Sequence, residues 1–488
     1  MPSVALPSLL FCKSSADCPK IDPEVFADVR LTSLLPPNTL DAVGYILGEE
    51  DIIARREIFS CLQDTGFRSR MSALKESAEE AGRFDEFYNA ARSESERDII
   101  FVSLMKAVLE FYRLASALGG DGVLLSRFND FFSTQVNMSW FRETSDSLEK
   151  TYPLVTSVLY NRICLMTKGE NIRVRDKGKR SYLSIISQCA ENLGLEKPSR
   201  QPTPPAPLSI NIIEGIVKAA PDEFAAFSEF RKSRMPFYDR TLLSYISQLG
   251  FYLGFVSVFD RVTAAGIPLI FPMISDEKKF MIKDAYDITL LAKDSLKIVP
   301  NDVIFTEKEP FFYLTGANGG GKTTYLRAVG VAALMFSIGC PVACEKAEIS
   351  IPGGIFTHFP RDERFDSSGR FNDEQNRVDR ILEKADGRSI VLLNETYSAT
   401  SEDRAVTLTA ALGARLFKTG VFGLYITHQH GISQTKVPYL NVIVDVAANN
   451  RRTYKVERRR ADKSSYARDI LEKYKLTREH LGERFGEV

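Results

Sequence analysis

The chain has 488 residues, of which 44% are hydrophobic and 26% are charged, so it is long enough for two or three domains that each bury a core. Its 63 basic and 63 acidic residues cancel, which gives a formal net charge of zero. This balance excludes a strongly basic protein that attracts nucleic acid over its whole surface, so any contact with DNA has to come from a local patch.

The cysteines and the apolar segments indicate the compartment. The cysteines match neither a disulfide framework nor a paired zinc site, which favours a reducing cytoplasm; they are Cys12, Cys18, Cys61, Cys164, Cys189, Cys340 and Cys344. The amino-terminal apolar run has no basic region before it, which argues against a secretory signal. Residues 242–259 are uncharged but include several polar side chains, so they predict a buried helix rather than a membrane span.

The first part of the chain predicts a mainly helical region. From Ser93 to Leu118, apolar residues recur at helical spacing after a capping serine, and the pattern stops at Gly119 and Gly120. Similar spacing recurs in residues 52–62 and 222–230. These patterns favour several long helices that each bury one face.

Two features interrupt this helical region. Residues 171–186 predict two short strands about an Asp-Lys-Gly-Lys turn, and the proline-rich residues 197–207 predict a connector. The candidates for contact with DNA phosphates lie on the predicted hairpin and are Arg173, Arg175, Lys177, Lys179 and Arg180. A basic turn is also typical of a solvated surface, so both interpretations stay open.

The pattern changes near Asp287. Short apolar runs now alternate with helical stretches, at residues 311–316, 389–394 and 421–427. This rhythm is typical of a parallel sheet covered by helices. We therefore expect a helical domain at residues 1–282 and an α/β domain at residues 283–488.

A glycine-rich loop follows the first of these apolar runs. Residues 316–323 fit the pattern G-x-x-x-x-G-K-S/T, and they stand between a predicted strand and a helix predicted at 324–336. In this setting backbone N–H groups point at phosphate oxygens, the lysine reaches the β and γ phosphates, and the threonine hydroxyl binds Mg²⁺. The alternative is a structural turn. The predicted ATP contacts are Gly316, Asn318, Gly319, Gly320, Gly321, Lys322, Thr323 and Thr324.

Polar residues also end the two later apolar runs. Asn394 is a candidate to hold the magnesium shell and Glu395 to orient the attacking water, unless the pair only marks the end of a strand. Thr427 and His428 follow the next strand. His428 is a candidate to sense the γ-phosphate or to lie on the base, although a single histidine often has a structural role.

Together these residues resemble the MutS family of DNA mismatch-repair ATPases. Residues 315–357 are similar to the family's Walker A region, and Asn394-Glu395 with Ala399-Thr400-Ser401 resemble its Walker B motif and D-loop. Thr427-His428 resembles its switch, and Lys463-Ser464-Ser465-Tyr466 resembles a late motif. The resemblance implies a mainly α-helical core and lever region followed by an α/β P-loop NTPase domain of the ABC type.

The resemblance also implies roles that the motifs alone do not. Residues 298–302 resemble the segment that enters the family's adenine pocket, which implies a nucleotide contact at Ile298. Phe371 and Glu374 match the aromatic and acidic positions of the signature loop, which reaches across a dimer to the partner's ATP. Gly369 stands where the signature serine is expected, and Ser368, or Ser367 beside it, is the candidate substitute.

Two further departures from the family pattern affect the expected activity. The chain starts at what should be the core, so we expect a short form without the mismatch-reading amino-terminal domain. Asn394 stands in place of the Walker B aspartate, which predicts slow ATP hydrolysis.

The resemblance implies a homodimer that uses ATP and Mg²⁺ to sense mismatched or irregular DNA. The alternative is a MutS-like nucleotide switch that acts as an assembly or scaffolding factor without DNA recognition. A small-molecule kinase is disfavoured, because the signature positions fit a dimerising ATPase. Binding to DNA that falls steeply with salt and changes with the nucleotide separates the first two hypotheses.

Overall fold

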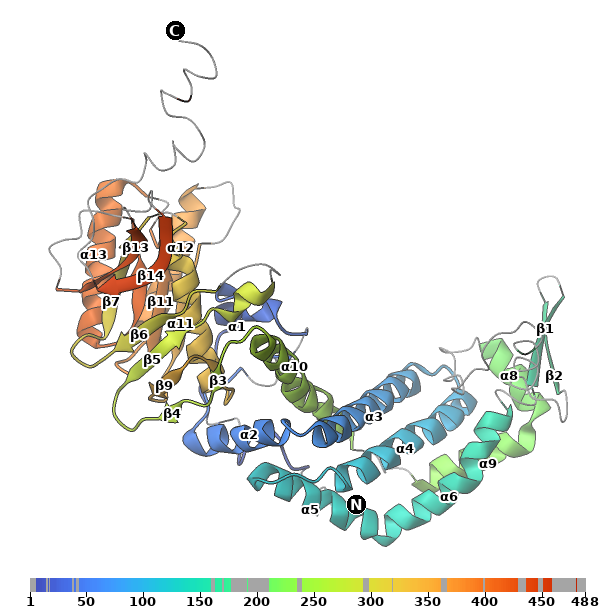
Figure 1. The fold of residues 1–488 in the computed structure, drawn as a ribbon. Coiled ribbons are helices and arrows are strands. Elements are labelled where there is room, and N and C mark those ends of the chain that lie inside the picture. The colour runs from blue at the N-terminus through green and yellow to red at the C-terminus, as the bar shows by residue number, and fades with distance from the viewer. Residues whose placement is uncertain are drawn as a thin grey trace. The chain divides into compact units, whose positions relative to one another are not determined.

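The computed structural model describes residues 6–158 (without 15, 17, 37–38 and 41–43), 163–168, 171–176, 191, 210–234, 239–292, 298–360 (without 318), 367–397, 400–428, 436–445, 451–458 and 480. The chain folds into two compact units (Figure 1). The helical unit takes in residues 1–9 and 60–253, and the sheet unit takes in residues 10–59 and 254–488. Helices α2 (Glu49–Cys61) and α10 (Ser244–Ala264) run from one unit into the other.

The compact units divide the chain differently from the boundary expected after residue 282. The sheet unit includes residues 10–59 as well as the residues just before that boundary. Arg55 shows a physical reason, because its side chain is fully buried and donates hydrogen bonds to the backbone oxygens of Leu10 (2.9 Å) and Ile338 (3.0 Å). A buried guanidinium needs such acceptors, and here they come from segments far apart in the sequence.

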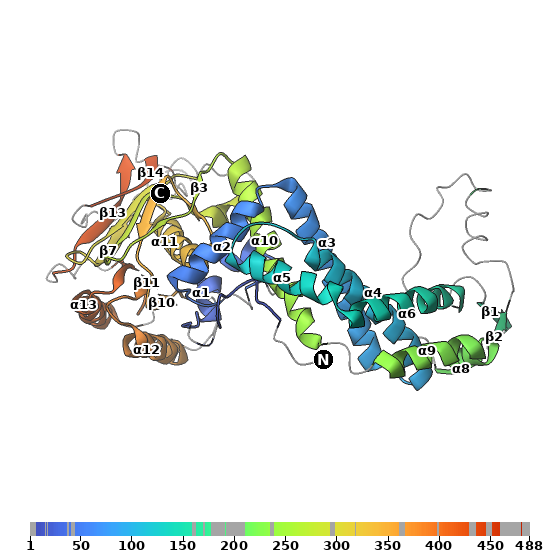
Figure 2. The same ribbon diagram turned by 90° about the horizontal axis from the view of Figure 1, so that it is seen from below.

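The helical unit is organised around one central helix. Its described helices are α3 (Thr65–Ala90), α4 (Glu94–Ser116), α5 (Val123–Asn137), α6 (Ser139–Thr156), α8 (Ile210–Ala219) and α9 (Pro221–Arg234), with a 3-10 turn at Arg240–Leu243. Helix α4 packs against α3, α5, α6 and α9 (Figure 2). Because α4 has neighbours on several sides, it buries residues around most of its circumference.

Aromatic side chains fill the core beside α4. Phe111 stacks on Tyr245 with ring centroids 5.4 Å apart and meets Phe132 edge-on at 5.6 Å. Phe128 packs between the same neighbours, 4.7 Å from Phe132. Such rings bury large apolar areas and hold the helices in a fixed register.

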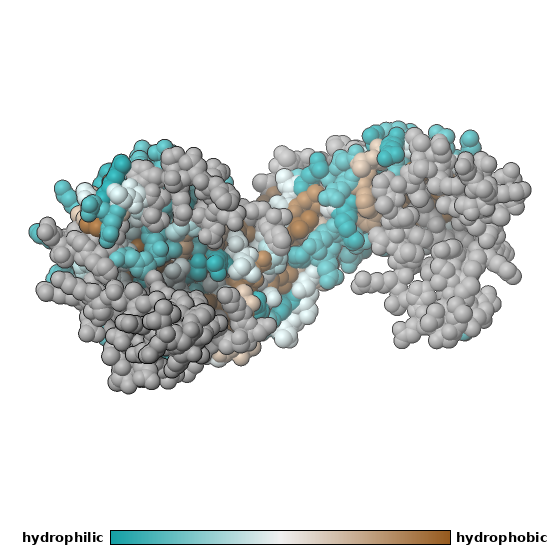
Figure 3. All heavy atoms as spheres, turned by 90° about the horizontal axis from the view of Figure 1, so that it is seen from above, coloured by the Kyte–Doolittle hydropathy of each residue, from teal (hydrophilic) through white to brown (hydrophobic). Residues whose placement is uncertain are grey.

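On the face shown in Figure 3, hydrophilic residues cover much of the described surface, with hydrophobic residues in smaller areas between them.

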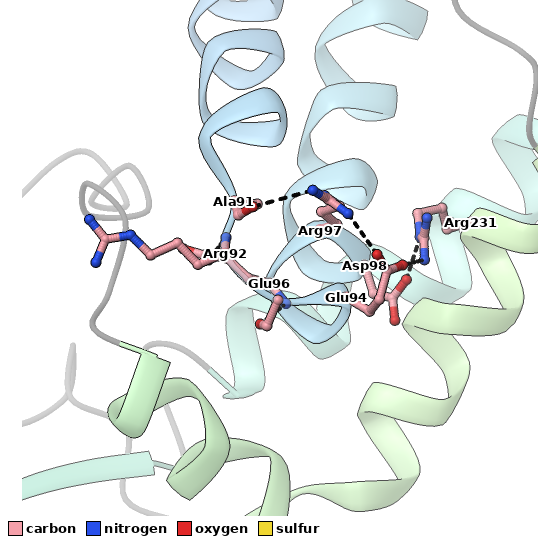
Figure 4. A network of polar contacts seen from close by, with 8 residues as sticks. Ala91, Arg92, Glu94, Glu96, Arg97, Asp98 and Arg231 are labelled. Atoms are coloured by element: carbon pink, nitrogen blue, oxygen red, sulfur yellow. Dashed lines mark hydrogen bonds and ion pairs between the residues drawn. The ribbon is translucent and has the colours of Figure 1, made fainter.

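Helix α4 begins at the serine predicted to cap it. The Ser93 hydroxyl accepts a hydrogen bond from the N–H of Glu96 (3.2 Å), and the Glu96 carboxylate accepts one from the N–H of Arg92 (2.8 Å). This reciprocal arrangement satisfies N–H groups that a helix start leaves open. Arg231 of α9 pairs with Glu94 and Asp98 on the next turn (Figure 4). The start of α4 is therefore tied to the end of α9.

The basic hairpin differs from the prediction. Residues 171–176 form a strand as expected, β2 (Asn171–Asp176), but its partner is β1 (Ile163–Lys168), which precedes it in the chain. The antiparallel register joins Lys168 to Asn171 across a two-residue connection, a length that favours a tight hairpin. The second strand predicted after Asp176 lies outside the described residues, as does the proline-rich connector.

The sheet unit contains a six-stranded sheet in the order β10-β11-β12-β7-β13-β14. Its strands are β7 (Phe311–Gly316), β10 (Ile355–His358), β11 (Ile390–Asn394), β12 (Phe422–Ile426), β13 (Tyr439–Asp445) and β14 (Arg451–Arg458). All of them run parallel except β14, which pairs antiparallel with β13. The three apolar runs predicted as strands are β7, β11 and β12, so a helical region together with an α/β sheet region is confirmed.

Helices cover both faces of this sheet. Helices α12 (Ser367–Lys384) and α13 (Glu402–Thr419) bury side chains of one face, including Phe311, Tyr313 and Tyr425. Helix α11 (Lys322–Ser337) packs on the other face, where a Cβ added at Gly330 would lie 2.6 Å from the Val29 side chain and 3.0 Å from that of Leu392. Glycine is needed at this position because the helix approaches both Val29 and the sheet so closely.

Smaller strands complete the sheet unit. One sheet has the order β4-β9-β5-β6 and a second pairs β3 with β8; their bounds are β3 (Leu269–Ile270), β4 (Met273–Ile274), β5 (Phe280–Ala285), β6 (Asn301–Phe305), β8 (Val342–Ala343) and β9 (Lys346–Ile349). Helix α11 contacts β5 and β8 as well as the large sheet. Its first turn is therefore held firmly beside β7.

Among the described residues, one helical segment, Arg240–Ala264, is long and apolar enough to cross a membrane. Its aromatic side chains are buried, and the hydroxyls of Tyr245 and Tyr252 each donate a 2.6 Å hydrogen bond, to the backbone oxygens of Pro7 and Leu9. Buried tyrosines with satisfied hydroxyls are typical of a protein core. These contacts favour the predicted buried helix over a membrane span.

Candidate functional site

Three segments meet at one edge of the large sheet. Strands β11, β12 and β7 are parallel neighbours, so their carboxyl ends lie side by side. The N–H of Glu395 donates to the oxygen of Ile426 (3.0 Å), and the N–H of Thr427 donates to the oxygen of Leu314 (3.2 Å). The structure therefore brings together the glycine-rich loop, the Asn394-Glu395 pair and Thr427-His428.

The glycine-rich loop lies close against strand β13. A Cβ added at Gly316 would lie 2.7 Å from the Asn441 Oδ1 atom, and the residue has a φ of +122°. A Cβ at Gly320 would lie 2.9 Å from the backbone oxygen of Ala317. These positions exclude side chains, so the backbone itself forms the surface that faces a ligand. Asn318 lies outside the described residues.

Lys322 is the first residue of α11 and is folded over the loop. Its side chain is buried, and Nζ donates to the backbone oxygens of Gly316 (2.9 Å) and Ala317 (3.1 Å). Its positive charge acts on Glu395 across the site, where it helps to lower the pKa of that carboxyl. Thr323 and Thr324 follow on the first turn of α11 and are half-buried.

Glu395 and His428 form a pair at the mouth of the site. Their Oε1 and Nε2 atoms are 2.8 Å apart, and both side chains are about 40% exposed, at 40% and 42%. The hydrogen bond with His428 is the main cause that lowers the pKa of Glu395, while partial burial acts in the opposite direction. Glu395 is therefore an ionised carboxylate near neutral pH, which suits a group that accepts a proton from water.

The backbone after β11 is strained and firmly held. Glu395 has a φ of +50° and Tyr397 has a φ of +67°, a region that disfavours residues with side chains. The Tyr425 hydroxyl donates to the backbone oxygen of Thr396 (3.1 Å), and the Thr396 hydroxyl lies 3.1 Å from Nδ1 of His358. These buried contacts fix the turn that aims Glu395 into the site.

The residues present fit a nucleotide with its magnesium ion. The Oδ1 atom of Asn394 is buried and has no hydrogen-bond partner in the described part of the chain, which leaves an oxygen available to a metal-bound water. The glycine cradle leaves room that a Cβ would fill, and Lys322 brings a positive charge to it. Thr323 is the matching hydroxyl on α11, so Thr323 and Asn394 would hold Mg²⁺.

Asn301, Tyr454 and Val456 form a contact beside the loop that the sequence did not predict. The amide of Asn301 donates to the oxygen of Tyr454 (3.0 Å) and accepts from the N–H of Val456 (2.8 Å). Tyr454 is 47% exposed, and its ring lies 3.3 Å from a Cβ added at Gly321. Ile298 lies three residues before Asn301, on the segment that leads to this contact. The family resemblance points to residues 298–302, but no sequence pattern pairs Asn301 with Tyr454.

The signature positions lie on a helix rather than in a loop. Ser368 and Gly369 are in the first turn of α12, and Glu374 follows on the next turn with 5% exposure. Burial raises the pKa of Tyr397 to about 12, and hydrogen bonding from Gln375 of α12 opposes this rise. Helix α12 therefore contacts the strained turn that carries Glu395.

The basic residues predicted to contact DNA belong to the other unit. Arg173 and Arg175 are on β2 of the helical unit, whereas Lys177, Lys179 and Arg180 lie outside the described residues. Arg173 and Arg175 thus belong to a different unit from the residues that meet at the sheet edge.

Comparison with known proteins identifies similar sequences for the carboxyl-terminal region. Residues 312–476 match the family described as MutS domain V. The chain is 33% identical to the DNA mismatch repair protein MSH2 of Saccharomyces cerevisiae over 178 residues, which cover 36% of this chain and 18% of that protein. It is 34% identical to the DNA mismatch repair protein MutS of Petrotoga mobilis over 157 residues, 32% of this chain and 19% of that protein. The similarity thus spans about a fifth of each relative.

Proposed function

We propose that this chain, a MutS-family member by its carboxyl-terminal region, binds and hydrolyses ATP and uses the nucleotide to switch its binding to DNA. The observation that carries this proposal is the meeting of the glycine-rich loop, Lys322 and the Glu395–His428 pair at one sheet edge. The sheet unit then acts as a P-loop NTPase domain of the ABC type.

The proposed binding step uses the backbone and few side chains. N–H groups of the loop and the start of α11 bind phosphate oxygens, and Lys322 exchanges its two loop carbonyls for the β and γ phosphates. Tyr454 and the segment from Ile298 to Asn301 lie beside the loop where the nucleoside would extend. When bound, ATP supplies the γ-phosphoryl group and Mg²⁺ neutralises its oxygens.

The proposed hydrolytic step depends on Glu395. Its ionised carboxylate orients a water molecule and withdraws a proton from it, while His428 keeps the carboxylate in place through the 2.8 Å contact. Asn394 supplies a neutral oxygen where the family has a carboxylate, so it attracts the metal less strongly. We therefore propose slow turnover and a long-lived ATP-bound state.

Replacing His428 with alanine is expected to move the acidic limb of the kcat profile to higher pH. The wild-type pKa of Glu395 is lowered chiefly by the His428 hydrogen bond, so its removal leaves the opposing effect of burial and the pKa rises. As the solution is acidified, the variant protonates Glu395 earlier and loses activity earlier. Steady-state hydrolysis between pH 4 and 8 (about the range in which carboxyl groups titrate) measures the shift. Coincident acidic limbs would contradict the role of His428, and His428→Gln, which retains a donor, should shift less.

Two copies of the chain are proposed to work as a homodimer with composite sites. In this arrangement the start of α12, with Ser368, Gly369 and Glu374, faces the nucleotide of the second copy. The contact between α12 and Tyr397 gives a route from that surface to Glu395 within one copy. Analytical ultracentrifugation with and without a non-hydrolysable ATP analogue tests the state of association.

The DNA to be sensed is proposed to be mismatched or irregular. This step rests on the relatives, whose printed names describe DNA mismatch repair proteins. The deciding experiment measures binding to homoduplex, mismatched and branched DNA, with and without ATP, over a range of salt concentrations. Nucleotide-dependent binding to irregular DNA supports the proposal. ATP binding without any DNA binding would favour an assembly or scaffolding switch instead.

Reversing the charges of Arg173, Arg175 and Lys179 together is expected to weaken DNA binding and flatten its salt dependence. Each lost phosphate contact reduces the slope of log K against log salt by about 0.9, so three contacts change it by about 2–3. Nucleotide binding should persist, because these residues belong to the helical unit and the predicted nucleotide contacts belong to the sheet unit. Titration of fluorescent DNA at several salt concentrations measures both quantities.

The matched control reverses three exposed cations of the same unit, with the same change in net charge. Arg83, Arg142 and Lys150 are exposed residues of α3 and α6. If the control variant loses as much affinity as the hairpin variant, or if the hairpin variant keeps the parental salt slope, the DNA contact is elsewhere.

A further inference from the structure

Strand β10 lies at one edge of the large sheet. It is last in the strand order, and in the described part of the chain β11 is the one strand that pairs with it, while helices α1 and α12 also contact it. The N–H of Ile390 donates to the oxygen of Gly354 (2.8 Å), and the register pairs Ile355 with Ile390. In a parallel ladder the next residue turns its backbone groups the other way. The N–H and C=O groups of Ile355 and Thr357 therefore point away from β11.

Only some of the backbone groups at this edge of β10 have a hydrogen-bond partner in the described chain. Arg377 of α12 donates to the backbone oxygens of Thr357 (3.2 Å) and Phe359 (3.3 Å). Among the residues that the structure describes, the N–H and C=O of Ile355 and the N–H of Thr357 have no hydrogen-bond partner. Ile355 and Thr357 are only 3% and 5% exposed, and backbone groups at such positions normally have a partner.

A cavity of about 320 Å³ lies along the same edge. Strand β10 forms one wall, α12 forms a second, and the segment that leads into α1 (Pro23–Asp28) forms a third. Its lining includes Lys20, Ile46, Ile355, Thr357, Arg380 and Ile381. The volume is at the lower end of the range for ligand pockets, which suits a short segment of peptide.

The rim of this cavity is basic. Three exposed cations form no ion pair within the described ranges: Lys20, Arg380 and Lys384. The lining holds two acidic residues, Asp22, which caps α1 and keeps its charge, and Glu24, which lies 3.4 Å from Arg377. Arg377 is further neutralised by Asp28 at 2.9 Å. The charge left over is positive, which complements an acidic ligand.

We propose that this edge binds an extended acidic segment of a partner protein, which adds to β10 as a further strand. The two N–H groups and the C=O that have no partner in the described chain need a ligand with both acceptors and a donor, which a peptide backbone provides and a simple anion does not. Arg380 and Lys384 of α12 bind alternate acidic side chains on one face of the added strand, and Ile46 on the opposite wall contacts the apolar side chains of its other face. This inference does not depend on ATP hydrolysis or on DNA binding.

The test uses the full chain and a fluorescein-labelled pool of hexapeptides in which Asp or Glu alternates with Val, Ile or Leu. A pool with Lys or Arg at the acidic positions is the matched probe. Fluorescence anisotropy should show binding of the acidic pool only. The double variant Arg380→Glu with Lys384→Glu should weaken it on the order of tenfold or more. The control Arg415→Glu with Lys418→Glu, which reverses exposed cations on α13, should bind like the parent.

Hydrogen exchange adds a readout of the backbone contact. The acidic pool should slow exchange at the N–H groups of Ile355 and Thr357, and it should leave Phe356, whose N–H faces β11, unchanged. The proposal is overturned if the acidic pool does not bind, if the basic pool binds equally, or if the rim variant binds like the parent. Absence of protection at Ile355 and Thr357, or binding of citrate in place of the peptides, would overturn it as well.

Discussion

ATP binding is expected to be lost when Lys322 is replaced with alanine. The buried ammonium is the only side-chain cation that the described part of the loop presents, and it donates to two carbonyls of that loop. Phosphates would replace those acceptors, so the variant loses charge-assisted hydrogen bonds in a water-poor site. Loss of such a buried partner costs about 3 kcal/mol or more, which weakens binding at least about a hundredfold.

Isothermal titration with ATP and Mg²⁺ measures this effect. Because removal of a buried charge also affects folding, thermal unfolding of the variant without nucleotide gives the comparison. Lys418→Ala, an exposed lysine in the last turn of α13, is the matched control and should bind ATP like the parent. An Lys322→Ala variant that folds normally and binds ATP with parental affinity would show that this loop is not the nucleotide site.

Local patterns were enough to predict the elements that position the site. The run at residues 311–316 forms β7 with the predicted bounds, and the helix predicted at 324–336 lies within α11. Because the strands are parallel, the carboxyl ends that carry Asn394 and His428 had to lie at one sheet edge. The geometry of the site therefore follows from alternation of apolar runs and a loop motif.

Contacts between segments far apart in the sequence could not be predicted in this way. Nothing in residues 10–59 indicates that Arg55 is buried against the oxygen of Ile338, because the hydrogen bond forms only after both segments fold. The same applies to Asn301 and Tyr454, which are joined across 153 positions. Hydrophobic periodicity reports which face of an element is buried, and it does not report the partner.

The turn after β11 illustrates a second limit. A positive φ is favoured by glycine, yet Glu395 and Tyr397 adopt it because backbone bonds to Ile426 and the Tyr425 hydroxyl hold the turn. Tyr397 also buries its ring in the core under α12 and α13, which offsets part of the strain. Residue propensity alone would place neither of them in this conformation.

Replacing Glu395 with glutamine is expected to reduce ATP hydrolysis by about 10²–10⁴-fold while ATP binding persists. Glutamine keeps the size of the side chain but cannot accept a proton from water, whereas the loop and Lys322 remain intact. The loss should appear in kcat and not in the affinity measured by titration. A variant that hydrolyses ATP like the parent would remove Glu395 from the catalytic step.

Asn394→Asp tests the other half of the same site and should have the opposite effect. The Asn394 oxygen is buried without a partner in the described chain, so a carboxylate there would place a full negative charge next to the metal position. A buried carboxylate costs free energy when it has no cation beside it, and a bound Mg²⁺ offsets that cost. The variant should therefore bind Mg²⁺ more tightly, and it should hydrolyse ATP faster when Mg²⁺ is limiting. The difference should vanish when Mg²⁺ saturates both proteins, because the charge changes the affinity for the metal. ATPase assays across a magnesium titration separate these cases. If Asn394→Asp is no faster at any Mg²⁺ concentration, asparagine is not what limits hydrolysis, and the strained turn that aims Glu395 becomes the element to change next.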